Sequence, residues 1–128
     1  MARDVSDSTP IASRDELVGW LEQGCKPASA FRLGTEHEKF PFYKSDLTPV
    51  PYEGDDLGRC GIRVLLQEMQ KTTGWDPIID SGNIIGLFDP AGGGAISLEP
   101  GGQFELSGAP LDTLHQTGAE LGSHMAAA

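Results

Sequence analysis

Positive charge is scarce in this chain of 128 residues, and its second part has none apart from histidine. Nine Lys and Arg residues stand against nineteen Asp and Glu residues, which gives a net charge of −10 at pH 7. Lys71 is the last Lys or Arg, so the sequence from Thr72 onward carries mainly acidic charge. A surface of this sign repels nucleic acid backbones and anionic membranes, and we therefore expect no nucleic acid partner and no membrane partner.

Cysteines are few and long apolar runs are missing. Cys25 and Cys60 are the two cysteines, and their spacing fits neither a zinc site nor a disulfide-rich scaffold. No apolar run approaches the roughly 20 residues that a membrane helix requires. Residues 1–10 are polar and lack the apolar stretch of a secretory signal, so we expect a disordered leader there and one incomplete domain over residues 11–128.

Three segments have helical patterns. Ser13 and Glu16 form a capping box before the first of them, and Gly24 is its expected end. The second is expected over about residues 57–73, with Asp55 and Asp56 as candidate caps. The third is expected to open at Ala109-Pro110. Their expected apolar faces are Leu17, Trp20 and Leu21; Ile62, Leu65, Leu66 and Met69; and Leu111, Leu114, Leu121 and Met125.

Strand patterns lie between these helices and predict an α+β fold, an antiparallel sheet flanked by helices. The residues from Asp89 to Gly94 are a turn by composition, and their glycines lack the Lys and Ser or Thr of a phosphate-binding loop. The expected strands are residues 31–42, 77–80, 84–88, 95–99 and 103–107.

Acidic side chains recur at even spacing within two of these strand regions. Glu36 and Glu38 are two residues apart, so both carboxylates point to one face of a strand, and His37 points to the other. Glu99, Gln103 and Glu105 also differ by even numbers. The intervening Pro-Gly-Gly can form a bulge that turns Glu99 away from the others.

Carboxylates that converge on a half-buried sheet repel each other unless their pKa values rise or a hard divalent cation binds them. Mg²⁺ commonly takes substrate phosphate oxygens as further ligands, so the pattern predicts a phosphate-bearing substrate. A simpler alternative remains open, in which glutamates of an antiparallel sheet merely face water. The spacing from Glu36 to Lys39 is also found in metal-dependent nucleases, but the negative net charge disfavours that reading.

Two longer motifs resemble the glutamate–cysteine ligases of plants and many proteobacteria. They are GTEHEKF at residues 34–40 and SLEPGGQFELSGAPL at residues 97–111, and the shorter NIIGL at 83–87 and LHQT at 114–117 fit the same family. The resemblance implies that residues 11–128 are the N-terminal portion of one catalytic domain like that of glutamine synthetase.

The same resemblance implies the first step of glutathione biosynthesis. In that reaction Mg²⁺ and ATP are used to join the γ-carboxylate of glutamate to the amine of cysteine through an acyl phosphate. It implies Glu36, Glu38 and Glu105 as metal ligands, Glu99 as a weaker candidate ligand, and Gln103 as a substrate contact. Two alternatives remain: another carboxylate–amine ligase, and a metal-binding module without catalysis.

The chain lacks the basic residues that would bind ATP phosphates, and its last helix has no stop signal. We therefore expect a fragment that is inactive on its own. Plant members of the family carry a cysteine after His-Gln-Thr, where this chain has Gly118. From that difference we predict no disulfide switch through this helix, and a cytoplasmic protein, bacterial rather than plastid.

Overall fold

The computed structural model describes residues 8–128 and divides the chain into two units, residues 1–32 and 33–128. Most of the expected leader, residues 1–7, lies outside the described residues. The first unit contains α1 (Arg14–Glu22) and a 3₁₀ turn, η1 (Ala28–Ala30). Ser13 caps α1 as predicted, because its Oγ accepts a hydrogen bond from the Glu16 amide. No helix among residues 8–128 is long and apolar enough to cross a membrane.

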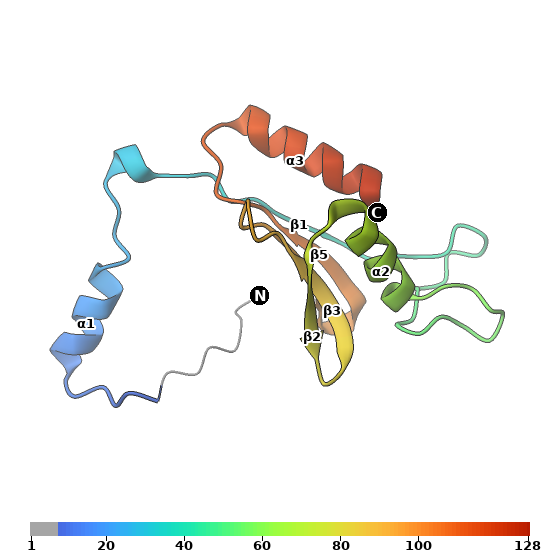
Figure 1. The fold of residues 1–128 in the computed structure, drawn as a ribbon, viewed down its shortest axis with the longest axis horizontal. Helices are drawn as coiled ribbons and strands as arrows, with labels where there is room; N and C mark the ends of the chain where they lie inside the picture. The colour runs from blue at the N-terminus through green and yellow to red at the C-terminus, as the bar shows by residue number, and fades with distance from the viewer. Residues whose placement is uncertain (1–7) are drawn as a thin grey trace. The chain divides into compact units, whose positions relative to one another are not determined.

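The second unit contains a five-stranded antiparallel sheet with the strand order β1-β5-β4-β3-β2, accompanied by two helices (Figure 1). This architecture confirms the predicted α+β fold. The strands are β1 (Glu36–Lys39), β2 (Asp76–Asp80), β3 (Asn83–Phe88), β4 (Ala95–Glu99) and β5 (Gln103–Ser107), and the helices are α2 (Ile62–Thr73) and α3 (Leu114–Ala127).

The hydrophobic core lies between α2 and one face of this sheet. Three α2 residues that the helical pattern placed on one side are buried there, namely Ile62, Leu66 and Met69. A bulge at Ile85 lets Ile84 and Leu87 join the same core, because the register of β2 and β3 skips Ile85. The core of the sheet is completed by Ile96, Phe104 and Leu106.

The start of α2 differs from the prediction. Asp55 does not cap this helix; its carboxylate accepts hydrogen bonds from the amides of Leu57 and Arg59 and forms an ion pair with the Arg59 side chain at 2.5 Å. These contacts hold residues 55–59 in a loop, so α2 begins only at Ile62, with Gly61 as its N-cap. At the other end Gly74, with φ of 71°, terminates the helix directly after Thr73, where the helical pattern placed its end.

The start and the buried face of α3 also differ from the prediction. Thr113 and Gln116 form a capping box, so the helix begins at Leu114 rather than at Ala109-Pro110. Leu114 and Met125 are exposed, whereas His124 is the buried residue of the helix. The predicted apolar face is therefore wrong at Leu114 and Met125, whereas Leu121 is half-buried on the same side as His124, whose polar ring faces the sheet.

The first strand is shorter than the expected residues 31–42. It ends at Lys39, two residues before Pro41, which has no amide hydrogen to donate to a sheet. On either side only isolated bridges continue the pairing, Leu33 with Leu111 and Phe42 with Pro49.

Gly86 on β3 is expected to be essential for the sheet. A Cβ atom at this position would lie 2.3 Å from the carbonyl oxygen of Ile96 on β4. We predict that Gly86→Ala lowers the free energy of unfolding by about 1–3 kcal/mol, since the strand backbones must move apart. Urea denaturation measures this change, and Gly118→Ala is the control because its added Cβ meets nothing within 4 Å. Equal stabilities of the two variants would contradict the prediction.

Candidate functional site

The five residues singled out by the sequence lie on one face of the sheet, which we call the carboxylate face: Glu36, Glu38, Glu99, Gln103 and Glu105. Glu38 and Glu105 are direct partners in the pairing of β1 with β5, and Glu105 is also paired with Ser97 of β4. Side chains at paired positions point to the same side of a sheet. Because the core residues Phe104 and Leu106 alternate with Glu105 along β5, this face is opposite to the hydrophobic core.

The hairpin between β4 and β5 settles the direction of Glu99. Pro100–Gly102 form a 3₁₀ turn, η2, in which Gly101 and Gly102 have φ values of 81° and 80° that favour glycine. Glu99 is paired with Gln103 directly across this turn. The Pro-Gly-Gly segment therefore connects two strands in register, and Glu99 and Gln103 both lie on the carboxylate face.

Glu105 is the most buried of the carboxylates. Its residue is 7% exposed, and its Oε1 accepts a hydrogen bond of 2.5 Å from the Ser107 hydroxyl. Glu38 stands directly opposite on the edge strand, and like charges at paired positions destabilise a sheet. The pair is thus a place where a bound cation would lower the electrostatic cost.

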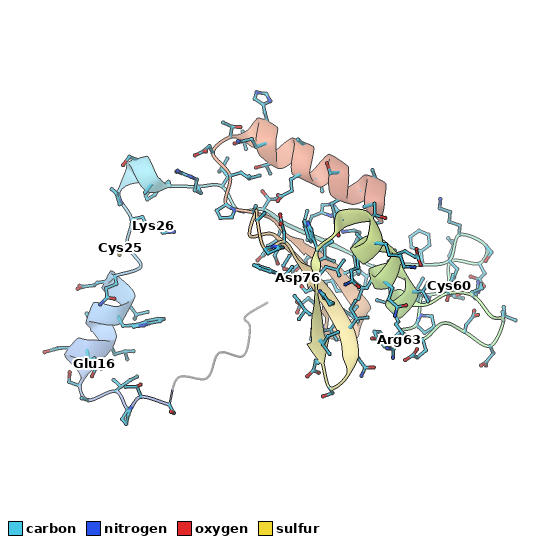
Figure 2. All side chains as sticks on the ribbon, in the orientation of Figure 1. Glu16, Cys25, Lys26, Cys60, Arg63 and Asp76 are labelled. Carbon is cyan, nitrogen blue, oxygen red and sulfur yellow. The ribbon has the colours of Figure 1, made fainter. Side chains whose placement is uncertain are left out.

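The ion pairs described within residues 8–128 lie away from this face. Among residues 8–128, no Lys or Arg forms an ion pair with Glu36, Glu38, Glu99 or Glu105. Arg63 on α2 instead pairs with Glu53 and donates to the Asn83 side chain at 2.9 Å (Figure 2). The donor set consists of carboxylate oxygens, which suits a hard cation such as Mg²⁺. In the described part of the chain, however, no three His, Cys, Asp or Glu side chains are gathered closely enough to hold a metal ion by themselves.

The opposite face of the same two strands carries a cluster of nitrogen atoms, formed by His37, Lys39 and His124. The Lys39 ammonium donates to Nε2 of His124 at 2.5 Å and lies 3.4 Å from Nδ1 of His37. The His124 ring stacks on Phe104 with a centroid distance of 6.2 Å. His37 thus packs against α3, as predicted from the alternation of the strand, and does not point toward the glutamates.

Burial changes the acid–base properties of this cluster. Burial, together with the nearby charges of Lys39 and His37, lowers the pKa of His124 from 6.5 to about 4. Burial also lowers the pKa of Lys39. His124 is therefore neutral at neutral pH, and the hydrogen bond from Lys39 to Nε2 leaves its buried Nδ1 without a hydrogen-bond partner.

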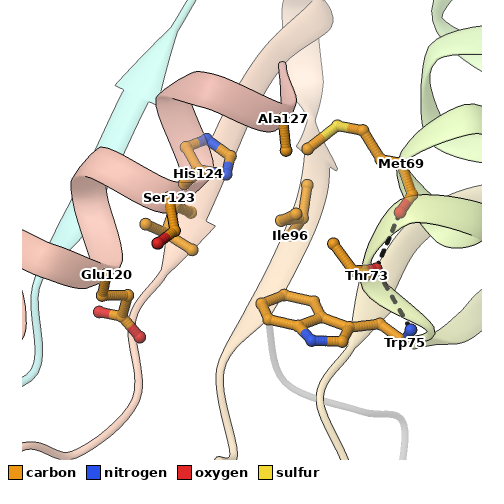
Figure 3. Close-up of a pocket in the computed structure, with 9 residues that line it drawn as sticks. Met69, Thr73, Trp75, Ile96, Glu120, Ser123, His124 and Ala127 are labelled. Carbon is orange, nitrogen blue, oxygen red and sulfur yellow. Dashed lines mark hydrogen bonds between the residues drawn. The ribbon is translucent and has the colours of Figure 1, made fainter.

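A cavity of about 120 Å³ lies between α2, α3 and the sheet, next to His124 (Figure 3). Its walls are almost entirely apolar and include Met69, Trp75 and Ile96. The Thr73 hydroxyl at its edge is already used, because it donates to the Met69 carbonyl and accepts from the Trp75 amide. The cavity therefore belongs to the interior that supports α3 rather than to the carboxylate face.

Comparison with known sequences identifies the family. The family described as glutamate-cysteine ligase family 2 (GCS2) matches residues 32–128, which include all five residues of the carboxylate face. The chain belongs to the glutamate-cysteine ligase family 2. It is 49% identical over 117 residues to glutamate–cysteine ligase A, chloroplastic, of Oryza sativa subsp. japonica, covering 91% of this chain and 22% of the rice protein.

Two further relatives have similar values. The chloroplastic glutamate–cysteine ligase of Medicago truncatula is 46% identical over 122 residues, covering 95% of this chain and 22% of that protein. That of Arabidopsis thaliana is 45% identical over 118 residues, covering 92% of this chain and 21% of that protein. This GCS2 chain thus spans about a fifth of the length of the relatives that it matches.

The prediction of a cytoplasmic, bacterial setting is wrong. The relatives of this GCS2 chain are named as chloroplastic plant enzymes, which contradicts the expectation of a bacterial cytoplasm. The prediction rested on Gly118 in place of a cysteine. A single position bears on one possible disulfide and carries no information about the compartment. Cys25 and Cys60 are both free and exposed (Figure 2).

His124 is the residue of this GCS2 chain that the sequence did not single out for the site. The signal was present in the spacing of Thr117, Glu120, Leu121 and His124, which recur at intervals of three and four and form the side of α3 with the lower exposure. A search for apolar residues misses this side of the helix, because His124 and Glu120 are polar.

Proposed function

We propose that this chain provides the metal-binding sheet of a glutamate–cysteine ligase, an enzyme that joins the γ-carboxylate of glutamate to the amine of cysteine at the expense of ATP. The observation that carries the proposal is the shared carboxylate face, on which Glu38 and Glu105 are direct partners without a basic neighbour. The names of the relatives support the reaction. We propose further that the sheet is part of a catalytic domain like that of glutamine synthetase.

The proposed reaction has two steps, the phosphorylation of glutamate and the attack of the cysteine amine. An oxygen of the glutamate γ-carboxylate attacks the γ-phosphorus of ATP, and ADP leaves. The cysteine amine then attacks the acyl carbon, phosphate leaves and the nitrogen loses a proton. Both steps are favoured when the reacting groups are held in position and the charge on the phosphoryl group is neutralised.

Glu36, Glu38 and Glu105 would hold Mg²⁺ in this proposal, and Glu99 would be a fourth, weaker candidate ligand. Bound Mg²⁺ would supply the charge neutralisation for the phosphoryl group. Since no three His, Cys, Asp or Glu side chains of the described region are close enough together to hold a metal ion by themselves, water and ATP oxygens are expected to complete the coordination. Gln103 is paired with Glu99 and can donate or accept a hydrogen bond, which suits a contact with a substrate.

Within the part of the chain that the structure describes, no Lys or Arg pairs with the carboxylate face, so no cation is identified there for the phosphates of ATP or the α-carboxylate of glutamate. The relatives are about four times as long as this chain, and we propose that residues beyond those matched here supply these cations. The 128 residues alone are accordingly expected to be inactive.

The test is ADP release by the natural gene product that contains this sequence, measured with glutamate, cysteine and MgCl₂ in a coupled assay. We expect ADP release that requires cysteine and stops when EDTA is added. The 128-residue chain is assayed in parallel and is expected to release no ADP.

Two results would overturn the proposal. ADP release that is faster with another amine than with cysteine would make the protein a different carboxylate–amine ligase. A natural gene product that binds Mn²⁺ but releases no ADP would be a metal-binding module without this catalysis.

A further inference from the structure

Strand β1 carries two of the carboxylates but is weakly held by the sheet. It has four residues and lies at the edge, so β5 is its only neighbouring strand within the described region. An edge strand with one partner depends on other contacts to fix its position and twist. The side chains that alternate with Glu36 and Glu38 on β1 are His37 and Lys39, and these face α3.

The ring of His124 contacts both strands that carry the carboxylate pair. Its Nε2 accepts the 2.5 Å hydrogen bond from Lys39 on β1, and its face stacks on Phe104 of β5 at an interplanar angle of 19°. Lys39 and Phe104 are themselves direct partners in the strand pairing, one position beyond Glu38 and Glu105. A displacement of Lys39 therefore moves the backbone that carries Glu38.

The ring is in turn fixed by its surroundings. His124 is 6% exposed, and His37 approaches it edge-on with a centroid distance of 6.4 Å. Because a strand places successive side chains on opposite faces, contacts made on the α3 side determine where the carboxylates stand on the other side.

We infer that His124 is a positioning residue which, through Lys39 and Phe104, sets the spacing between Glu38 and Glu105 and thereby the affinity of the carboxylate face for a divalent cation. The inference rests on the proposed function for the assignment of these two glutamates as metal ligands. It adds a residue on the far side of the sheet, 19 positions along the chain from Glu105, that touches neither metal nor substrate.

The test uses the natural gene product and compares His124→Leu with His124→Gln. Leucine fills the space without an acceptor, whereas the glutamine side-chain oxygen can accept the hydrogen bond from Lys39. We expect the Mg²⁺ concentration for half-maximal rate to rise roughly tenfold or more in His124→Leu, which is the size of effect typical of groups that orient metal ligands. In His124→Gln, the Mg²⁺ concentration for half-maximal rate is expected to stay within about threefold of the value for the unsubstituted protein.

Leu66→Ala is the matched control for a loss of stability. Leu66 is fully buried on α2 and belongs to the core without lying in the cavity beside His124. We expect this variant to lower the melting temperature while leaving the Mg²⁺ dependence unchanged. If His124→Leu behaves in the same way as Leu66→Ala, the inference is wrong and His124 only packs.

Lys39→Met provides a second test that still applies if His124→Leu does not fold. Electrostatics alone predicts tighter binding of a cation when a nearby positive charge is removed. Positioning predicts weaker binding, since the hydrogen bond that holds β1 to α3 is lost. Tighter or unchanged binding by Lys39→Met would therefore overturn the inference.

Mn²⁺ binding, followed by electron paramagnetic resonance, separates this inference from the proposed reaction because it requires no turnover. Weaker Mn²⁺ binding by His124→Leu in a protein without ligase activity would support the positioning role and overturn only the proposed reaction. Ligase activity together with unchanged Mn²⁺ affinity in the variants would support the proposed reaction and overturn the positioning role of His124. A natural gene product that binds no Mn²⁺ would overturn the positioning role.

Discussion

Glu105→Gln is expected to lower the ligase rate of the natural gene product by about 100-fold or more, which corresponds to the several kcal/mol that a bound metal ion contributes to a transition state. The substitution keeps the size of the side chain and its ability to accept the hydrogen bond from Ser107, but removes the negative charge. Glu36→Gln is expected to act in the same direction. The measurement is the rate of ADP release at saturating substrates and Mg²⁺.

The folds of these variants should remain intact. Removal of charge from Glu105 also removes its repulsion with Glu38, so the melting temperature of Glu105→Gln is expected to stay the same or rise. Glu68→Gln is the control with the same chemical change, because Glu68 is exposed on α2 and its ion pair in the described residues is with the neighbouring Lys71. Full activity in both Glu36→Gln and Glu105→Gln would remove the carboxylate face from the mechanism.

Acid is expected to destabilise this protein through His124 before most carboxylates are protonated. The pKa of His124 is about 4 in the folded protein and 6.5 in the unfolded chain. Above pH 6.5 neither state binds the proton, and below that pH the unfolded state binds it first, so the free energy of unfolding falls as the pH is lowered. The loss is about 2 kcal/mol by pH 5 and about 3 kcal/mol by pH 4.

Urea denaturation of the 128-residue chain between pH 7 and pH 5 measures this effect. His124→Gln is the control, since glutamine fills a similar place and does not titrate, and its stability should change less over the same interval. Equal slopes for the two proteins would show that His124 does not remain neutral in the folded state. The interval is chosen because protonation of Asp and Glu residues dominates at lower pH.

Local patterns in the sequence were sufficient where one residue type controls the backbone. Gly74 ended α2, Ser13 capped α1, and the alternation of Glu36, His37 and Glu38 placed the glutamates on one side of β1 and the histidine on the other. These features depend on conformations and hydrogen bonds within a few residues, which the sequence specifies directly.

The same patterns failed where other groups compete for the side chain that the pattern uses. Asp55 resembled a helix cap, but Arg59 and the amides of the loop bind its carboxylate instead. The last helix was expected to bury Met125, yet the adjacent His124 is buried because Lys39 and Phe104 provide partners for its ring. Helical periodicity is judged from apolar residues. It cannot predict the burial of a polar side chain whose hydrogen-bond partner lies 85 positions away.

The sequence by itself determined the family, the acidic character and the presence of carboxylates at even spacing. Only the tertiary structure decided that Glu38 and Glu105 are direct partners and that the Pro-Gly-Gly turn keeps Glu99 on the same face. Only the tertiary structure showed that His124 contacts β1 and β5, the strands that carry Glu38 and Glu105. Strand register and helix docking arise from the burial of the whole core, and a local pattern in the sequence contains neither of them.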